Sequence, residues 1–217
     1  MTERGMIFNA EMVRAILDGR KTQTRRIMKV QPKPSKSRPG DFWFSSKKLE
    51  SMVHVSDLAP GNSPIADYHL FIQEHCCPFG AVGDRIWVRE TWARYNIDQN
   101  SHDIAYRATT PADWPEEGRW RPSIHMPRWA SRILLEITDV RVERLNAISE
   151  EDARAEGIID GGCLNCGEPE PCGCANPEPD ATDAFAYLWQ SIYGQENWNA
   201  NPWVWVIEFE RVEGGAA

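Results

Sequence analysis

The run of nine residues from Trp203 to Arg211 constrains the fold more than any other feature of the chain. Every second residue is bulky and apolar: Trp203, Trp205, Ile207 and Phe209. The residues between them are Val204, Val206, Glu208 and Glu210. Such a period of two is typical of a β-strand with one buried face. We therefore expect a strand here, with its second face becoming wet toward the end.

Two earlier segments also have the pattern of strands. Gly83-Asp84 is a turn signal, and the segment 85–92 that follows it is apolar enough for a buried strand. In 132–142, the residues Ile133, Leu135 and Ile137 alternate onto one face. Both segments are predicted to be strands.

Helical periodicity marks three other places. Asn9 is suited to cap a helix whose apolar stripe runs from Met12 to Leu17, and Gly19 stands where a left-handed residue ends a helix. The two further helices are predicted over 150–156, capped by Ser149 and ended by Gly157, and over 183–193, ended by Gly194.

Strands and helices do not alternate regularly along the chain, which favours an α+β fold over a parallel sheet. We expect a single domain over 1–217, built as a small β-barrel with flanking helices. The segments 29–81 and 93–123 are rich in loop-forming residues and have little periodicity, so they are predicted to be long insertions. A third insertion, at about 160–180, is rich in cysteine.

The charge of the chain is unevenly distributed. The total is −8, which argues against a uniformly basic surface that holds nucleic acid. Nevertheless, nine basic residues and one acid lie between Arg14 and Arg38, and eleven acids and two arginines lie between Glu143 and Asp183. We expect the two regions to lie apart and to favour an oriented anionic partner; the alternative is two solvated faces.

Cellular location follows from two absences in the sequence. No stretch approaches eighteen apolar residues, and the first residues contain no apolar export segment. The expectation is a cytoplasmic protein without a membrane partner, in which the six cysteines are reduced thiols or metal ligands.

The basic segment contains a compact polar motif directly after the first predicted helix. Residues 19–26 read Gly-Arg-Lys-Thr-Gln-Thr-Arg-Arg. A lysine, hydroxyl groups and arginines in this density suit recognition of a phosphate or a nucleobase. The alternative is a polar turn whose long side chains extend into water.

This motif resembles the signature of the ASCH domain, a PUA-like family of small β-barrels associated with RNA, with Gly19, Lys21, Thr24 and Arg26 at the signature positions. The segments 83–92 and 125–133 are similar to the rest of a phage or prophage ASCH-like group. The resemblance implies a PUA-like barrel and an RNA, nucleoside or nucleotide partner. For a phage protein, the cytoplasm would be that of the host cell.

One branch of this family is an amidohydrolase that removes the acetyl group from the exocyclic amine of acetylcytidine with a Lys, a Thr and a Glu. The resemblance assigns these roles to Lys21, Thr24 and Glu90. Thr24 would attack the acyl carbon, Lys21 with a lowered pKa would take its proton, and Glu90 would orient groups or protonate the leaving amine. Substrate contacts are expected from Gly19, Arg20, Arg25, Arg26 and His125.

These residues also have plainer uses. The lysine and arginines suit a phosphate backbone, and Glu90 suits an ion pair that holds its loop. His125 suits a structural hydrogen bond as well as a substrate contact. Most of the ten tryptophans are expected in the core, although some are suited to stacking on a base.

Four cysteines in the third insertion have the spacing C-x2-C-x5-C-x-C and are surrounded by glycine and proline. Four thiolates suit a closed, structural zinc site. The predicted ligands are Cys163, Cys166, Cys172 and Cys174; the alternative is a flexible loop with reduced thiols.

A second class of function competes with nucleic-acid or nucleoside binding. The excess of acids between residues 143 and 183 also suits a non-catalytic phage protein whose acidic surface engages a host protein or imitates nucleic acid.

Overall fold

The computed structural model describes residues 1–45, 53–58, 71–94, 104–115, 118–159, 165–166, 173–175 and 181–212. The strands are β1 (Glu3–Ile7), β2 (Gln23–Ile27), β3 (Lys33–Pro34), β4 (Phe42–Phe44), β5 (Val53–His54), β6 (Arg85–Arg89), β7 (Trp92–Arg94), β8 (Ile104–Tyr106), β9 (Leu134–Arg144) and β10 (Trp203–Arg211). The α-helices are α1 (Ala10–Leu17), α3 (Glu150–Ala155), α4 (Ala181–Tyr193) and α5 (Gln195–Asn199). Shorter helical turns are η1 (Val55–Leu58), η2 (Ile72–Cys76), η3 (Arg107–Thr109), η4 (Ser123–His125), η5 (Arg128–Ala130) and η6 (Leu145–Ala147).

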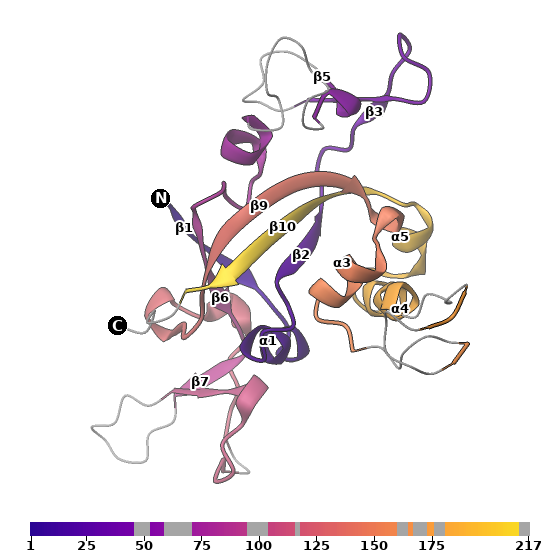
Figure 1. Cartoon of the computed structure of the whole chain (residues 1–217). Coiled ribbons are helices and arrows are strands. Elements are labelled where there is room, and N and C mark those ends of the chain that lie inside the picture. The colour runs from indigo at the N-terminus through magenta and orange to yellow at the C-terminus, as the bar shows by residue number, and fades with distance from the viewer. Residues whose placement is uncertain are drawn as a thin grey trace.

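Five strands form the main sheet in the order β1-β6-β9-β10-β2 (Figure 1). Strands β1 and β6 are parallel, and the other neighbours are antiparallel. The mixed α+β prediction is therefore confirmed. The closed barrel is not formed in the described part of the chain, because β1 and β2 remain the two edges of the sheet. The two edges are linked by the guanidinium of Arg26, which donates to the carbonyl of Ile7 at 3.0 Å.

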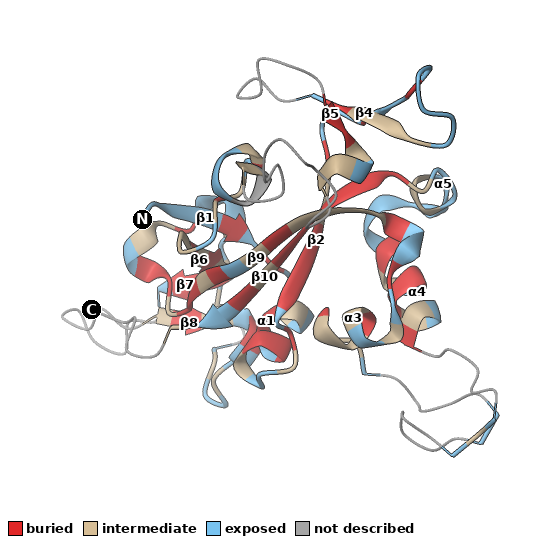
Figure 2. Cartoon of the chain, turned by 45° about the horizontal axis from the view of Figure 1, so that its top comes forward, coloured by how far each residue is buried: buried red, intermediate tan, exposed pale blue. Residues whose placement is uncertain are grey.

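Strand β10 is buried along most of its length (Figure 2) and contributes residues to two apolar cores, which explains its sequence pattern. Trp203, Trp205, Ile207 and Phe209 face the larger core, which also contains Val13 and Ile16 of α1. Val204 and Val206 face a second core with Phe185 and Trp189 of α4. The second face becomes polar at Glu208 and exposed at Glu210, as the sequence predicts.

The three predicted helices are present, although α4 begins at Ala181, two residues before the predicted start, and α3 ends at Ala155, one residue before the predicted end. The side chain of Asn9 accepts a hydrogen bond from the Met12 N–H at 2.8 Å, and Ser149 Oγ accepts one from the Asp152 N–H at 3.1 Å. Gly19 has a φ of +76°, as a residue that ends a helix requires. Among the described residues, no helix has the length and apolar character that crossing a bilayer demands.

The first two insertions contain more regular structure than their sequences suggest. Strands β3, β4 and β5 form a three-stranded sheet within 29–81. Strand β7, which begins one residue before the second insertion, pairs with β8 inside it. Local periodicity is weak because the strands are only two or three residues long. Tertiary packing stabilises them: the rings of Phe42 and Phe44 meet Trp203 and Trp205 of β10 edge-on, at 5.4 and 6.0 Å between centroids.

Candidate functional site

A buried ion pair joins the basic motif to the end of α3. Lys21 Nζ lies 2.6 Å from Glu156 Oε2 and donates to the Glu156 carbonyl at 2.8 Å, and the two side chains are 0% and 4% exposed. Local structure places both groups. The turn after α1 places the N–H of Lys21 3.0 Å from the carbonyl of Ala15, and Thr22 donates to the carbonyl of Ala155 at 2.8 Å.

Burial lowers the pKa of the Lys21 ammonium, because the charged form loses its hydration. The Glu156 carboxylate opposes this by favouring the charged form, and the nearby Arg26 and Arg25 add to the lowering. The pKa is thus lowered in the sense that proton transfer by Lys21 requires, with burial as the main cause rather than the neighbouring arginines.

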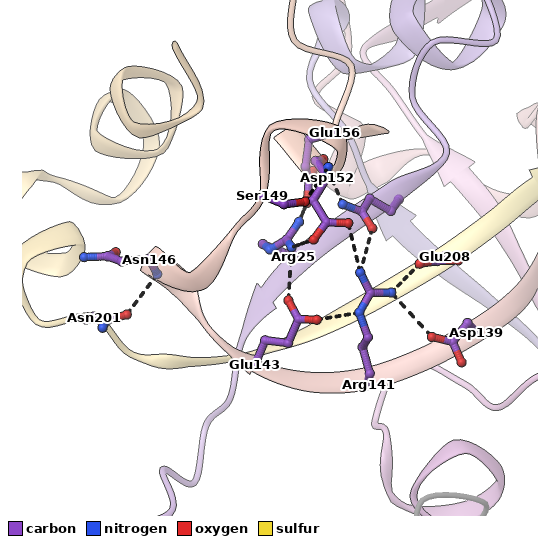
Figure 3. Close-up of polar contacts among 11 residues, drawn as sticks. Arg25, Asp139, Arg141, Glu143, Asn146, Ser149, Asp152, Glu156, Asn201 and Glu208 are labelled. Carbon is purple, nitrogen blue, oxygen red and sulfur yellow. Dashed lines mark hydrogen bonds and ion pairs between the residues drawn. The ribbon is translucent and has the colours of Figure 1, made fainter. Parts of the chain in front are cut away.

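Lys21 and Glu156 belong to a wider charge network, which we define as Lys21, Gln23, Arg25, Asp139, Arg141, Glu143, Asp152, Glu156 and Glu208. Figure 3 shows the part of this network around Arg25 and Arg141. The buried Arg25 guanidinium contacts Asp152 at 2.9 Å and Glu143 at 3.1 Å, and its other Nη lies 3.4 Å from Glu156. Arg141 contacts Glu143 at 2.6 Å and Asp152 at 3.1 Å, and also pairs with Glu208.

The network corrects the expectation that the basic and acidic regions lie apart. Lys21 and Arg25 come from the basic segment, whereas Glu143, Asp152 and Glu156 come from the acidic one. Buried charges are stable only when they are paired and hydrogen-bonded, so the two segments neutralise each other beside the sheet. At these positions the opposite charges therefore mainly stabilise the fold through ion pairs within the protein.

Sequence inspection overlooked the acidic half of this network, although a signal for it exists. Asp139, Arg141 and Glu143 occupy every second position of the chain, so their side chains lie on one face of a strand whose other residues are mostly apolar. Charged residues that recur with a period of two on a buried strand indicate an ionic layer against a neighbouring element.

Gly157 lets the end of α3 approach the basic motif. Its φ is +90°, and a Cβ at this position would lie 2.8 Å from the Cβ of Ala15 and 3.0 Å from that of Lys21. We expect Gly157→Ala to lower the free energy of unfolding by about 2–3 kcal/mol, through backbone strain and overlap together. Urea unfolding followed by circular dichroism measures this loss.

Gly40 provides the matched control for that substitution. Its φ is +88°, and a Cβ there would meet no atom within 4 Å. Gly40→Ala is therefore expected to lose only the strain contribution, about 1 kcal/mol. Equal losses for the two variants would show that close packing at Gly157 is unimportant.

Thr24 lies on the other face of β2 from Arg25. It pairs in register with Ile207, which faces the larger core, whereas Arg25 pairs with Val206, which faces the second core. Gln23 and Arg25 both contact Asp152, on the same side as the Lys21–Glu156 pair. Thr24 and Lys21 are thus near in sequence but directed differently, and the proton relay between them stays a prediction.

A small cavity of about 20 Å³ lies at the β2 edge, between α1 and α4. Its lining includes Thr24, Arg25 and Glu156, and the Nε of Arg25 is buried without a partner among the described residues. This volume holds about one water molecule and does not hold a nucleobase.

A larger cleft opens beside it, which we call the α1–α4 cleft. Its volume is about 440 Å³, within the range of small-molecule sites. It is lined by residues of α1, the turn after α1, the end of α3 and α4, among them Glu11, Arg14, Asp18, Arg20, Glu156, Ala184 and Leu188. Met12, Glu156 and Leu188 line both the cleft and the small cavity, so the two spaces adjoin.

The remaining arginines of the motif have contacts within the protein. Arg20 donates to the carbonyl of Gly157 at 2.8 Å and pairs with Asp18 at 3.0 Å. Arg26 bonds the Ile7 carbonyl and lies over the ring of Phe8, 5.3 Å from its centroid. Gly19 supplies the turn before them. Of the predicted binding residues, Arg20 lines the α1–α4 cleft, and Arg25 and Arg26 line the small cavity.

Glu90 follows β6 and forms a different ion pair. Its two oxygens accept hydrogen bonds from Arg132 at 2.9 and 3.0 Å, and its N–H lies 3.2 Å from the sulfur of Met126. Burial raises the pKa of the Glu90 carboxyl, and Arg132 opposes the rise. The carboxylate that contacts Lys21 is that of Glu156, and Glu90 lines neither the cleft nor the small cavity. Its catalytic role stays a prediction.

Two further sets of predicted residues lie elsewhere. His125 is exposed at the end of η4. Cys163 and Cys172 fall outside the described residues, whereas Cys166 is exposed and Cys174 is half-buried. The four-thiolate zinc site therefore remains an expectation from the spacing of the cysteines.

Comparison with known proteins finds no relative of this chain. The chain matches no model of a protein family, no curated protein and no solved structure.

Proposed function

We propose that the α1–α4 cleft binds a nucleobase or nucleoside, and that the chain is a PUA-like protein of the ASCH type, as its motif implies. The observation that carries the proposal is the position of Glu156. Its carboxylate holds the buried Lys21 ammonium, and the residue is part of the wall of a cleft of about 440 Å³. A polarised pair of this kind at the wall of a pocket is typical of a functional site.

The charge of the cleft favours a neutral base over a phosphate. Arg14 and Arg20 are balanced there by Glu11, Asp18 and Glu156. Arg20 already has two partners within the protein, while Lys21 and Arg25 are fully buried in ion pairs. A carboxylate accepts hydrogen bonds from an exocyclic amine, and Glu11, Asp18 and Glu156 are the acidic residues that line the cleft. Cytosine and its derivatives have such an amine.

Hydrolysis of an N-acylated cytidine is the enzymatic form of this proposal. The Thr24 oxygen would bond to the acyl carbon while the carbon–nitrogen bond breaks, Lys21 would carry the proton to the leaving amine, and water would then release the acid. This step is more demanding than binding, because Thr24 on β2 and Lys21 in the turn before β2 are directed differently, and Thr24 lines the small cavity rather than the α1–α4 cleft. We therefore test binding and turnover separately.

The experiment uses calorimetric titration of the full chain with cytidine, acetylcytidine and cytidine monophosphate, and chromatography for released cytidine. Ala184→Phe fills the cleft from α4 and is expected to weaken nucleoside binding at least tenfold. Tyr187→Ala is the control, because Tyr187 is on the same helix, is 75% exposed and does not line the cleft. Equal affinity in wild type and Ala184→Phe, or no binding by folded wild type, would contradict the proposal.

The competing function, capture of a host protein by an acidic surface, stays a prediction, although four of the eleven acids between residues 143 and 183 have partners within the protein. Glu143, Asp152 and Glu156 pair with internal cations. Glu150 pairs with Arg154 and accepts hydrogen bonds from the first residues of α4. These acids serve the fold and are poorly placed to imitate a phosphate backbone.

A further inference from the structure

The segment from Arg85 to Arg132 differs in character from the rest of the chain. It holds half of the ten tryptophans, and its eight arginines outnumber its six acidic residues in a protein with a net charge of −8. It includes the β7–β8 hairpin, which projects from the sheet on the side away from β3 and β5 (Figure 1). Aromatic and cationic residues are therefore concentrated in this part of the sequence.

Trp129 is the centre of this region. It is a large aromatic residue that is 58% exposed, on the short turn η5. The Arg94 guanidinium lies over its ring at 5.6 Å, and the buried Trp92 meets it edge-on with ring centroids 5.8 Å apart. The ring of Trp129 is thus supported from beneath while much of it remains open to solvent.

Arg121 completes the arrangement. Its guanidinium lies 5.3 Å from the ring of Trp92. Two backbone hydrogen bonds between Trp92 and Arg121, of 3.2 and 2.7 Å, join their segments as in a sheet. Arg94 and Arg121 are exposed, and neither forms an ion pair in the part of the chain that the structure describes. Backbone pairing therefore joins Arg121 to Trp92, whose ring contacts Trp129, while Arg94 lies over the ring of Trp129 itself.

We propose that this surface, defined as Arg94, Arg121 and Trp129, binds a single strand of nucleic acid without strong sequence preference. Bases stack on exposed indoles and on guanidinium planes, and every base has a face for such contacts. Unpaired arginines attract the phosphates between successive bases. A single strand fits because its bases are accessible, whereas a duplex hides their faces.

This surface is separate from the α1–α4 cleft, since none of its three residues lines the cleft. The proposal therefore goes beyond nucleoside binding and does not depend on it. The two proposals together describe a protein that binds a nucleic-acid strand at one site and a base at another. Each site can be tested without the other.

The test is fluorescence anisotropy of a labelled twelve-nucleotide oligouridine, with the DNA equivalent and a duplex of equal length in parallel. Trp129→Ala is expected to weaken single-strand binding by about tenfold, because stacking of one base on an aromatic ring contributes about 1–3 kcal/mol. Arg94→Gln combined with Arg121→Gln is expected to make the slope of log affinity against log salt concentration shallower by about 1.4, which corresponds to two phosphate contacts.

Two controls separate this site from the others. Tyr187→Ala removes an aromatic ring that is 75% exposed on α4, and it should leave the affinity for the strand unchanged. Ala184→Phe, which blocks the cleft, should also bind the strand as wild type does. Unchanged binding by Trp129→Ala, equal binding of duplex and single strand, or no binding by folded wild type would each overturn the proposal.

Discussion

Glu156→Gln is expected to lower the free energy of unfolding by about 3–5 kcal/mol. The Lys21 ammonium is fully buried, and Glu156 is the carboxylate that contacts it. Removal of one partner from a buried ion pair leaves an uncompensated charge, whose lost hydration is not replaced. Urea unfolding at pH 7 measures the loss.

The size of this loss should depend on pH. In the wild type, burial lowers the pKa of Lys21 and Glu156 opposes the lowering, so the variant retains only the causes that lower it. Above its folded pKa, Lys21 is neutral in the folded variant but still protonated in the unfolded chain. The unfolded state then binds more protons, and stability rises with pH. The deficit of Glu156→Gln relative to wild type should therefore shrink as the pH is raised above neutral.

Two further variants test the explanation. Glu151→Gln alters an exposed acid on the same helix and should change stability by less than about 0.5 kcal/mol. The double variant Lys21→Met with Glu156→Leu removes both charges and should be more stable than Glu156→Gln alone, because an apolar pair of similar size requires no hydration. A double variant that is less stable than the single one would refute the argument from the unpaired charge.

Arg132→Met should be the second most damaging substitution, with a loss of about 3 kcal/mol. Glu90 is buried, and Arg132 donates to both of its oxygens. Without the guanidinium, the carboxylate has to remain charged without its partner or take up a proton. Thermal and urea unfolding report the change.

The stability of Arg132→Met should depend on pH in the opposite direction from that of Glu156→Gln. Burial already raises the pKa of Glu90, and loss of Arg132 removes the group that opposes the rise. Between the unfolded and folded pKa values, the folded variant binds the proton and the unfolded chain does not, so stability increases as the pH falls. The deficit of Arg132→Met relative to wild type should be smaller at pH 5 than at pH 7.

Arg128→Gln is the matched control for this pair. The ion pair of Arg128 with Glu3 has a similar length, 2.8 Å, but its two side chains are 40% and 39% exposed. Exposed pairs contribute about 0–1 kcal/mol, because water and salt screen them. Similar losses for Arg128→Gln and Arg132→Met would show that burial is not the cause.

The regular elements of the fold were accessible from the sequence because their signals are local. The cap at Asn9, the cap at Ser149 and the alternation that begins at Trp203 each depend on residues within a few positions of one another. The short strands of the insertions were not accessible. Phe42 and Phe44 form β4 against Trp203 and Trp205, more than 150 residues later in the chain.

The candidate site divides in the same way. The motif around Lys21 and Thr24 is conspicuous in the sequence, and its place between a helix and a strand is as expected. Its partners are not. The strand period separates Thr24 from Arg25, and the end of α3 brings Glu156, rather than Glu90, to the ammonium of Lys21.

The sequence by itself determined the helices α1, α3 and α4, the strands β6, β9 and β10, and where the basic motif lies. Only the tertiary structure decided that Lys21 and Arg25 of the motif pair with carboxylates of the acidic segment, that an α1–α4 cleft opens beside Glu156, and that Arg94 lies over the exposed ring of Trp129. The physical reason is range: caps and periodicity act over one or two turns, whereas pairing of buried charges and exposure of a ring depend on residues up to 135 positions apart.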